Sequence, residues 1–167
     1  LTTFGDRGYP LDWIKGMLEA YGDYIDVVKF TPTCLLAPWD DIEKKVALYR
    51  SHQIGVGSDD PIFAIPYYQG KADQALRTLR EIGFTHVQID TRHVELENSG
   101  AVEKADADEQ RYFALALDLG FKVVGEVGKK WPKGDRMRAG RGSLNIVATI
   151  AEIKRLLALG CEQVYLE

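Results

Sequence analysis

A unit that repeats along the chain places the strongest constraint on its fold. Each copy consists of an amphipathic helix, a turn, and a short strand rich in β-branched residues. The copies lie at residues 17–30, 46–58, 76–90, 113–127 and 153–167. Their spacing of about 30 to 40 residues is the size of a βα unit. Helices that alternate with apolar strands predict a parallel sheet with the helices packed against it.

The turns of these units carry a glycine in four of the five copies. Helices often end in a left-handed backbone conformation, which glycine adopts without steric cost. We therefore expect left-handed dihedrals at the four glycines that follow the predicted helices, namely Gly22, Gly83, Gly120 and Gly160.

Six strands are predicted when residues 2–6 are added as a first strand. Neither the glycine-rich fingerprint of dinucleotide-binding sheets nor a phosphate-binding P-loop follows that strand. This favours a (β/α)8 TIM barrel, an α/β fold, over the alternative of an open six-stranded sheet. A closed barrel needs eight strands. Residues 1–167 would therefore supply about six of the eight βα units. No Ser/Gly-rich linker divides residues 1–167, which predicts one barrel domain, incomplete at its C-terminus.

The composition is that of an ordinary globular protein, with 46% hydrophobic residues and a net charge of −4. It offers no clustered basic face for nucleic acid. No apolar run approaches the roughly 20 residues that span a bilayer, so no membrane partner is expected. Cys34 and Cys161 lack the spacing of metal ligands or of a disulfide framework. We expect a reducing compartment and hence the cytoplasm; a homo-oligomer is compatible with the sequence.

Charged residues lie at or just after the carboxyl ends of the predicted strands. They are Asp6, Lys29, Asp59, Asp60, Asp90, Glu126 and Glu167. In a barrel these ends meet at one mouth, where carboxylates repel one another unless a cation lies between them. Oxygen ligands without a His or Cys cluster suit Mg²⁺, which stabilises an enolate while a lysine moves the proton. The alternative for each residue is a solvated charge or a structural ion pair.

Three segments carry a resemblance to a known family. They are "GDYIDVVKF" at 22–30, "YYQGKADQALRTLREIGF" at 67–84 and "GFKVVGEVGKK" at 120–130. In these segments, and in "VYLE" at the end of the last strand, the chain resembles the phosphosulfolactate synthases. The resemblance implies a (β/α)8 barrel that adds sulfite to phosphoenolpyruvate with Mg²⁺, a carbon–sulfur lyase reaction on a small anionic substrate.

The resemblance also implies roles for individual residues. Lys29, Lys129 and Lys130 would be catalytic; Lys129 or Lys130 would protonate the carbanion or bind an anionic group of the substrate. Glu126 and Glu167 stand at matching motif positions and would hold the Mg²⁺; Asp6 and Asp90 are added as metal ligands because of their strand-end positions, not because of the resemblance. Lys71 in the "QGK" motif would bind an anionic group of the substrate, with solvation of the helix start as the alternative. Arg92 and His93 lie on a loop that departs from the family's pattern and would compensate for that departure by binding substrate, with an ordinary surface histidine as the alternative for His93.

Three loops depart from the family's pattern and leave other functions open. Glycine-rich turns of the family are replaced here by "TPTCLLAP" at 31–38, "GSDDP" at 57–61 and "DTRHVEL" at 90–96. Glycine turns bring backbone N–H groups close to anions, so their loss weakens the expected binding of a phosphorylated ligand. Two alternatives follow: an enzyme on the same scaffold that acts on another enolisable carboxylate, and a non-catalytic homologue with a stress or binding role.

Overall fold

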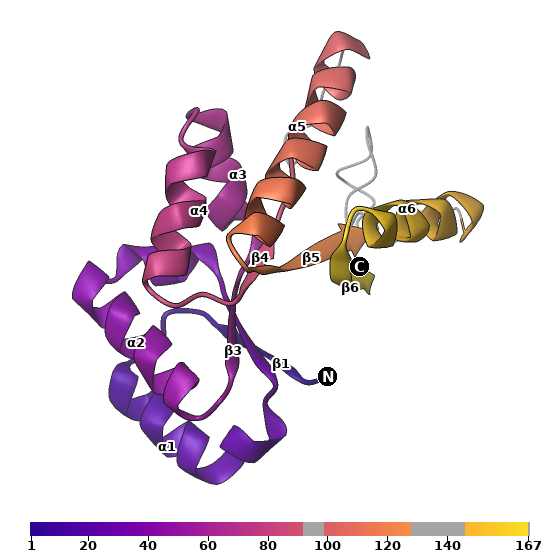
Figure 1. Cartoon of the computed structure of the whole chain (residues 1–167). Helices are drawn as coiled ribbons and strands as arrows, with labels where there is room; N and C mark the ends of the chain where they lie inside the picture. Colours follow the sequence, from indigo (N-terminus) through magenta and orange to yellow (C-terminus); the bar gives the residue numbers. More distant parts are fainter. Residues whose placement is uncertain (92–98, 128–145, 167) are drawn as a thin grey trace, which may run out of the picture.

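The computed structural model describes residues 1–91, 99–127 and 146–166. Six parallel strands form one sheet in chain order (Figure 1). They are β1 (Thr3–Asp6), β2 (Val27–Phe30), β3 (Gly55–Ser58), β4 (His86–Gln88), β5 (Lys122–Val127) and β6 (Cys161–Leu166). The sheet curls into a half-barrel, and the curl is strong enough to bring Thr3 Oγ1 of β1 within 3.2 Å of Tyr165 Oη of β6. The predicted barrel class is confirmed in this form.

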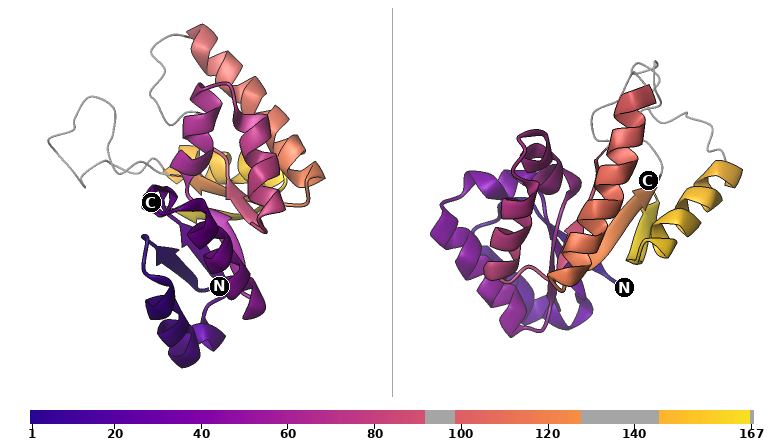
Figure 2. Two further views of the ribbon diagram at one scale, coloured as in Figure 1. Left: turned by 90° about the vertical axis from the view of Figure 1, so that its left-hand side faces the viewer. Right: turned by 45° about the horizontal axis from the view of Figure 1, so that its top comes forward.

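Helices lie between successive strands and cover the outer face of the sheet (Figures 1 and 2). The α-helices are α1 (Leu11–Tyr21), α2 (Trp39–Ser51), α3 (Asp60–Tyr68), α4 (Ala72–Glu81), α5 (Ser99–Asp118) and α6 (Ile146–Ala158). Two short 3-10 helices, η1 (Gly22–Tyr24) and η2 (Pro32–Leu36), flank β2. No helix within the three described stretches is both long and apolar enough to cross a membrane.

The main hydrophobic core fills the layer between the strands and the helices. Buried members include Ile14, Val28, Phe30, Tyr49, Phe63, Phe84, Phe113 and Val123. Phe30 packs edge-on against Tyr49 of α2 and Phe84, with ring centroids 6.0 and 5.2 Å apart. Side chains alternate between the two faces of a strand, so the strand residues next to Val28, Phe30 and Val123 point into the barrel interior.

The barrel interior at β3 is shaped by two glycines, Gly55 and Gly57. A Cβ atom on Gly55 would lie 2.7 Å from Cε1 of His86, and one on Gly57 would lie 3.2 Å from its Cβ. The His86 ring therefore fills the space that these glycines leave, and Nδ1 of the ring lies 2.8 Å from Oγ1 of Thr85. In the strand sequence "GVGS", the two glycines face the barrel interior and contribute no side chain there. Val56 and Ser58 face outward.

The left-handed turns follow the prediction at three of the four glycines. Gly83, Gly120 and Gly160 have φ of 103°, 79° and 102°. Gly22 differs, with φ of −55°, because it continues from α1 directly into η1 and so never needs the left-handed region. In the unit at 46–58, where no glycine directly follows the helix, Gln53 takes the left-handed conformation, with φ of 62°.

We expect opposite effects of substitution at two of these turns. Gly120→Ala should destabilise the fold by about 1 kcal/mol or more, because a Cβ atom disfavours left-handed dihedrals by about 1–2 kcal/mol. Gln53→Gly removes that strain and should be neutral or stabilising. Urea unfolding followed by circular dichroism measures both. A loss of stability in Gln53→Gly equal to that in Gly120→Ala would contradict the assignment of strain.

His86 predicts a dependence of stability on pH. Burial, and then the charge of Lys122, lower the pKa of His86 from its ordinary value of 6.5. The unfolded chain then binds more protons than the folded one, so stability falls as pH decreases through about 6.5. We expect the urea midpoint to drop less between about pH 7.5 and pH 5.5 in His86→Gln than in the parent protein. The exposed His52 supplies the control, His52→Gln, in which the parent drop should persist.

Candidate active site

Three charged side chains meet inside the barrel near the carboxyl ends of β2, β3 and β5. Lys29 Nζ lies 2.7 Å from Oδ1 of Asp59 and 3.8 Å from Oε2 of Glu126. Lys29 and Glu126 belong to β2 and β5, and Asp59 directly follows β3. The side chains of Lys29, Asp59 and Glu126 are 22%, 24% and 24% exposed, so a ligand can reach all three.

Gln88 of β4 adds a buried amide to this group, since the residue is only 2% exposed. Its Nε2 donates a hydrogen bond to Oε2 of Glu126 at 2.9 Å, and its backbone N–H donates to Oγ of Ser58 at 3.4 Å. Within the described part of the chain, its Oε1 is a buried acceptor without a hydrogen-bond donor. Such an atom costs free energy unless a ligand, an ion or water satisfies it.

On the side of β1 and β6, an aromatic ring and small residues lie near Lys29. The Lys29 ammonium lies 5.1 Å from the centre of the Tyr165 ring, a cation–π contact. Tyr165 Oη in turn lies 3.2 Å from Oγ1 of Thr3. Gly5 is the register partner of Lys29, and a Cβ atom built on it would meet nothing within 4 Å. The space beside Lys29 is therefore open.

Asp6 lies on the other face of the sheet and does not join this group. Its carboxylate is fully buried and accepts hydrogen bonds from the N–H groups of Gly8 and Tyr9 at 2.8 and 3.1 Å. Tyr49 Oη donates to its Oδ2 at 3.2 Å, and Lys45 Nζ lies 3.5 Å from the same oxygen. This placement gives the predicted metal role of Asp6 no support, because alternation turns the residue after Gly5 outward, toward α2.

Burial of this second cluster, around Asp6, also shifts the pKa values of neighbouring groups. Burial, and then the charge of Asp6, raise the pKa of the Cys34 thiol to about 11. The same two causes raise the pKa of Tyr49. Cys34 Sγ contacts the backbone oxygen of Asp6 at 2.9 Å. At neutral pH both groups remain protonated, and the thiol donates to the backbone oxygen of Asp6 while the phenol donates to its carboxylate.

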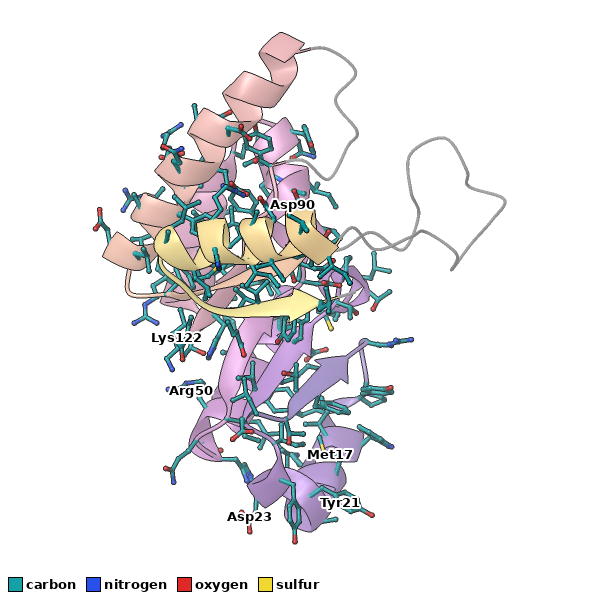
Figure 3. All side chains as sticks on the ribbon, turned by 90° about the vertical axis from the view of Figure 1, so that its right-hand side faces the viewer. Met17, Tyr21, Asp23, Arg50, Asp90 and Lys122 are labelled. Carbon is teal, nitrogen blue, oxygen red and sulfur yellow. The ribbon has the colours of Figure 1, made fainter. Side chains whose placement is uncertain are left out.

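Of the other predicted site residues, the structure describes two, Asp90 and Lys71, and the rest lie outside the described residues. Asp90 follows β4 and lies on the side toward which β6 points, whereas Lys122 and Arg50 lie where that strand begins (Figure 3). Lys71 is exposed at the start of α4, at the edge of a surface cavity of about 350 Å³ that Trp39, Ile62 and Pro66 also line. The remaining five lie outside the described residues: Arg92, His93, Lys129, Lys130 and Glu167.

Three residues of the site were not predicted as site residues: Gln88, Tyr165 and Thr3. Asp59 was among the charges expected at the barrel mouth, although no individual role was assigned to it. A usable signal existed for Gln88, which shares a strand face with Asp90. The contact between Thr3 and Tyr165 has no local signal, because the two residues are 162 positions apart in the sequence.

The site offers carboxylate and amide oxygens, which are the type of ligand that a hard cation prefers. In the three described stretches, no three His, Cys, Asp or Glu side chains gather closely enough to hold a metal ion. Mg²⁺, however, commonly binds through one or two carboxylates and takes its other ligands from water and substrate. Glu126 and Asp59 supply carboxylates, and the unsatisfied Gln88 Oε1 supplies an amide oxygen.

Comparison with known proteins assigns the family. The model of the (2R)-phospho-3-sulfolactate synthase family matches residues 1–167. The chain belongs to this family. Phosphosulfolactate synthases of Methanocaldococcus jannaschii and Methanothermobacter thermautotrophicus are 31% and 30% identical to it, over 81% and 82% of this chain. Those matches cover 51% and 50% of the two relatives, so the chain spans about half of their length.

Solved structures with low sequence identity share the fold of this phosphosulfolactate synthase family member. An L-ribulose 3-epimerase superimposes with a TM-score of 0.54 at 16% identity, over 98% of this chain and 58% of its own. The EAL domain of DcpA from Mycobacterium smegmatis gives a TM-score of 0.55 at 17% identity, over 97% of this chain and 63% of its own. These likenesses support the barrel architecture.

The placement of Asp6 yields a stability prediction. Lys45→Met should destabilise the protein by about 3 kcal/mol or more, because it leaves a buried carboxylate without its cation. Thermal or urea unfolding measures the loss. Lys44→Met is the matched control: Lys44 is the neighbouring residue, with an exposed side chain paired to Asp41, and its loss should cost less than about 1 kcal/mol. Equal effects of the two substitutions would refute a structural role for the buried pair.

Proposed function

We propose that the protein carries out the phosphosulfolactate synthase reaction, a Mg²⁺-dependent addition of sulfite to phosphoenolpyruvate through an enolate-type intermediate. Membership of the family supports the proposal, and so do the similar proteins that are named phosphosulfolactate synthases. The observation that carries it is the cluster of Lys29, Glu126 and Gln88 near the carboxyl ends of the strands, where barrel enzymes hold their active sites.

The residues of the cluster have complementary tasks in this proposal. Glu126 binds the cation or orders its water, and the Gln88 amide fixes the orientation of that carboxylate through its 2.9 Å hydrogen bond. Lys29 offsets the negative charge of the carboxylates beside it and donates hydrogen bonds to substrate oxygens. Bound Mg²⁺ supplies a Lewis acid that stabilises developing enolate charge. Lys129 or Lys130 is the proposed proton donor to the carbanion.

One observation favours a second candidate, an enzyme that acts on another enolisable carboxylate on the same scaffold. Asp59 occupies the loop after β3, where the family has a glycine turn, and its carboxylate lies 2.7 Å from the Lys29 ammonium. A lysine so engaged is less available to an anionic substrate. The second candidate retains the metal site and the proton chemistry but changes the substrate.

The role of Glu126 predicts a loss of metal affinity. Glu126→Gln keeps the size of the side chain but removes its charge, and we expect Mg²⁺ affinity to fall by about tenfold or more, as for substitutions at metal sites. Calorimetric titration with Mg²⁺ measures it. Glu162→Gln is the control, because Glu162 is exposed and pairs with Lys122 at the start of the strands. Unchanged Mg²⁺ affinity in Glu126→Gln would show that the proposed metal site is wrong.

The reaction itself separates the candidates. The full natural polypeptide that contains these residues is incubated with phosphoenolpyruvate and sulfite, with and without Mg²⁺, and followed by phosphorus NMR. A new phosphate ester signal that requires Mg²⁺ is the expected result. No signal from a folded protein that binds Mg²⁺ would favour the second candidate. No signal and no Mg²⁺ binding would favour a non-catalytic homologue.

A further inference from the structure

The carboxylate of Asp59 lies where an anionic ligand of Lys29 would bind. Its Oδ1 is 2.7 Å from Lys29 Nζ and also accepts a hydrogen bond from the N–H of Asp60, the first residue of α3, at 3.1 Å. An ammonium group and the N-terminus of a helix are both favourable neighbours for an anion. The protein's own side chain therefore occupies the anion position.

The charges around this position act against a second anion. Lys29 contributes one positive charge, whereas Asp59 and Glu126 place two carboxylates at 2.7 and 3.8 Å from its ammonium. A phosphate dianion that approached Lys29 would have to displace Asp59 and would meet Glu126 as a like charge. A carbonyl, hydroxyl or enol oxygen meets no such repulsion and can accept a hydrogen bond from the same ammonium.

We propose that Asp59 is a specificity-determining residue that excludes phosphate and other dianions from Lys29, so that a neutral oxygen of the substrate faces this lysine. The inference rests on the proposed function in one respect, because it takes the cluster to be the substrate site. A substrate that carries a phosphoryl group must then bind that group elsewhere in the barrel, with only its carbonyl or enol oxygen beside Lys29.

Capping of α3 does not by itself explain Asp59. Asparagine caps helices as well as aspartate does, and glycine costs only a few tenths of a kcal/mol in comparison. What neither residue provides is a carboxylate for the 2.7 Å contact with Lys29. Asp59→Asn and Asp59→Gly therefore retain the start of the helix and remove the charge that the proposal invokes.

The test is a titration of the full natural polypeptide with inorganic phosphate in the presence of EDTA, followed by calorimetry or phosphorus NMR. Removal of one charge in contact with the ammonium should tighten phosphate binding by about tenfold in Asp59→Asn and in Asp59→Gly. Circular dichroism verifies that both variants fold. Asp60→Asn is the control, because it removes an equal negative charge from the next residue in the chain. It should leave phosphate affinity within about twofold of the parent value.

A second variant assigns the gain to Lys29. In the Asp59→Asn background, Lys29→Met should abolish the tighter phosphate binding. The proposal is overturned if Asp59→Asn and Asp59→Gly bind phosphate no better than the parent protein, if Asp60→Asn gives an equal gain, or if the gain persists without Lys29. Because EDTA removes Mg²⁺ and no reaction is followed, these outcomes are independent of the metal and activity tests of the proposed function.

Discussion

The alternation of side chains along parallel strands, combined with the curl of the sheet, determines which charges of this protein can act together. Lys29 and Glu126 lie on different strands and point into the same interior, where Nζ and Oε2 are 3.8 Å apart. Asp6 ends the strand beside Lys29, yet it belongs to the opposite face and lies among α2 side chains. One position along a strand thus separates a residue of the site from a residue of the core.

The two charged clusters differ in their exposure to solvent. Asp6 and Lys45 have side chains that are 0% and 5% exposed, so no ligand reaches them. Asp6 accepts hydrogen bonds from Gly8, in the loop after β1, and from Tyr49 of α2, and so holds the loop against the helix. The group around Lys29 keeps 22% to 24% of each charged side chain exposed. Ions in that setting retain part of their hydration and can exchange it for a substrate or a cation.

Much of the fold could be predicted from the sequence because its signals are local. Hydrophobic patterns located all six strands, and turn glycines marked three left-handed turns. Gly22 misled because a 3-10 turn continues the helix there. For the candidate site, strand-end positions predicted that Lys29 and Glu126 come close together, as their 3.8 Å separation shows, whereas their roles stay predictions. Asp6 was assigned by its position at the strand end alone, without alternation, and that criterion does not distinguish the two faces.

The neutral members of the site could not be found by a search for charges. Gln88 carries no charge, yet it donates a hydrogen bond to Glu126, and its own amide oxygen is unsatisfied among the described residues. Glycine also contributes without a charge: Gly5 is the register partner of Lys29, and the position of its missing side chain is open. In the proposed site, we therefore expect the ligand preference at Lys29 to follow from its charge balance with Asp59 and Glu126 more than from the number of basic residues.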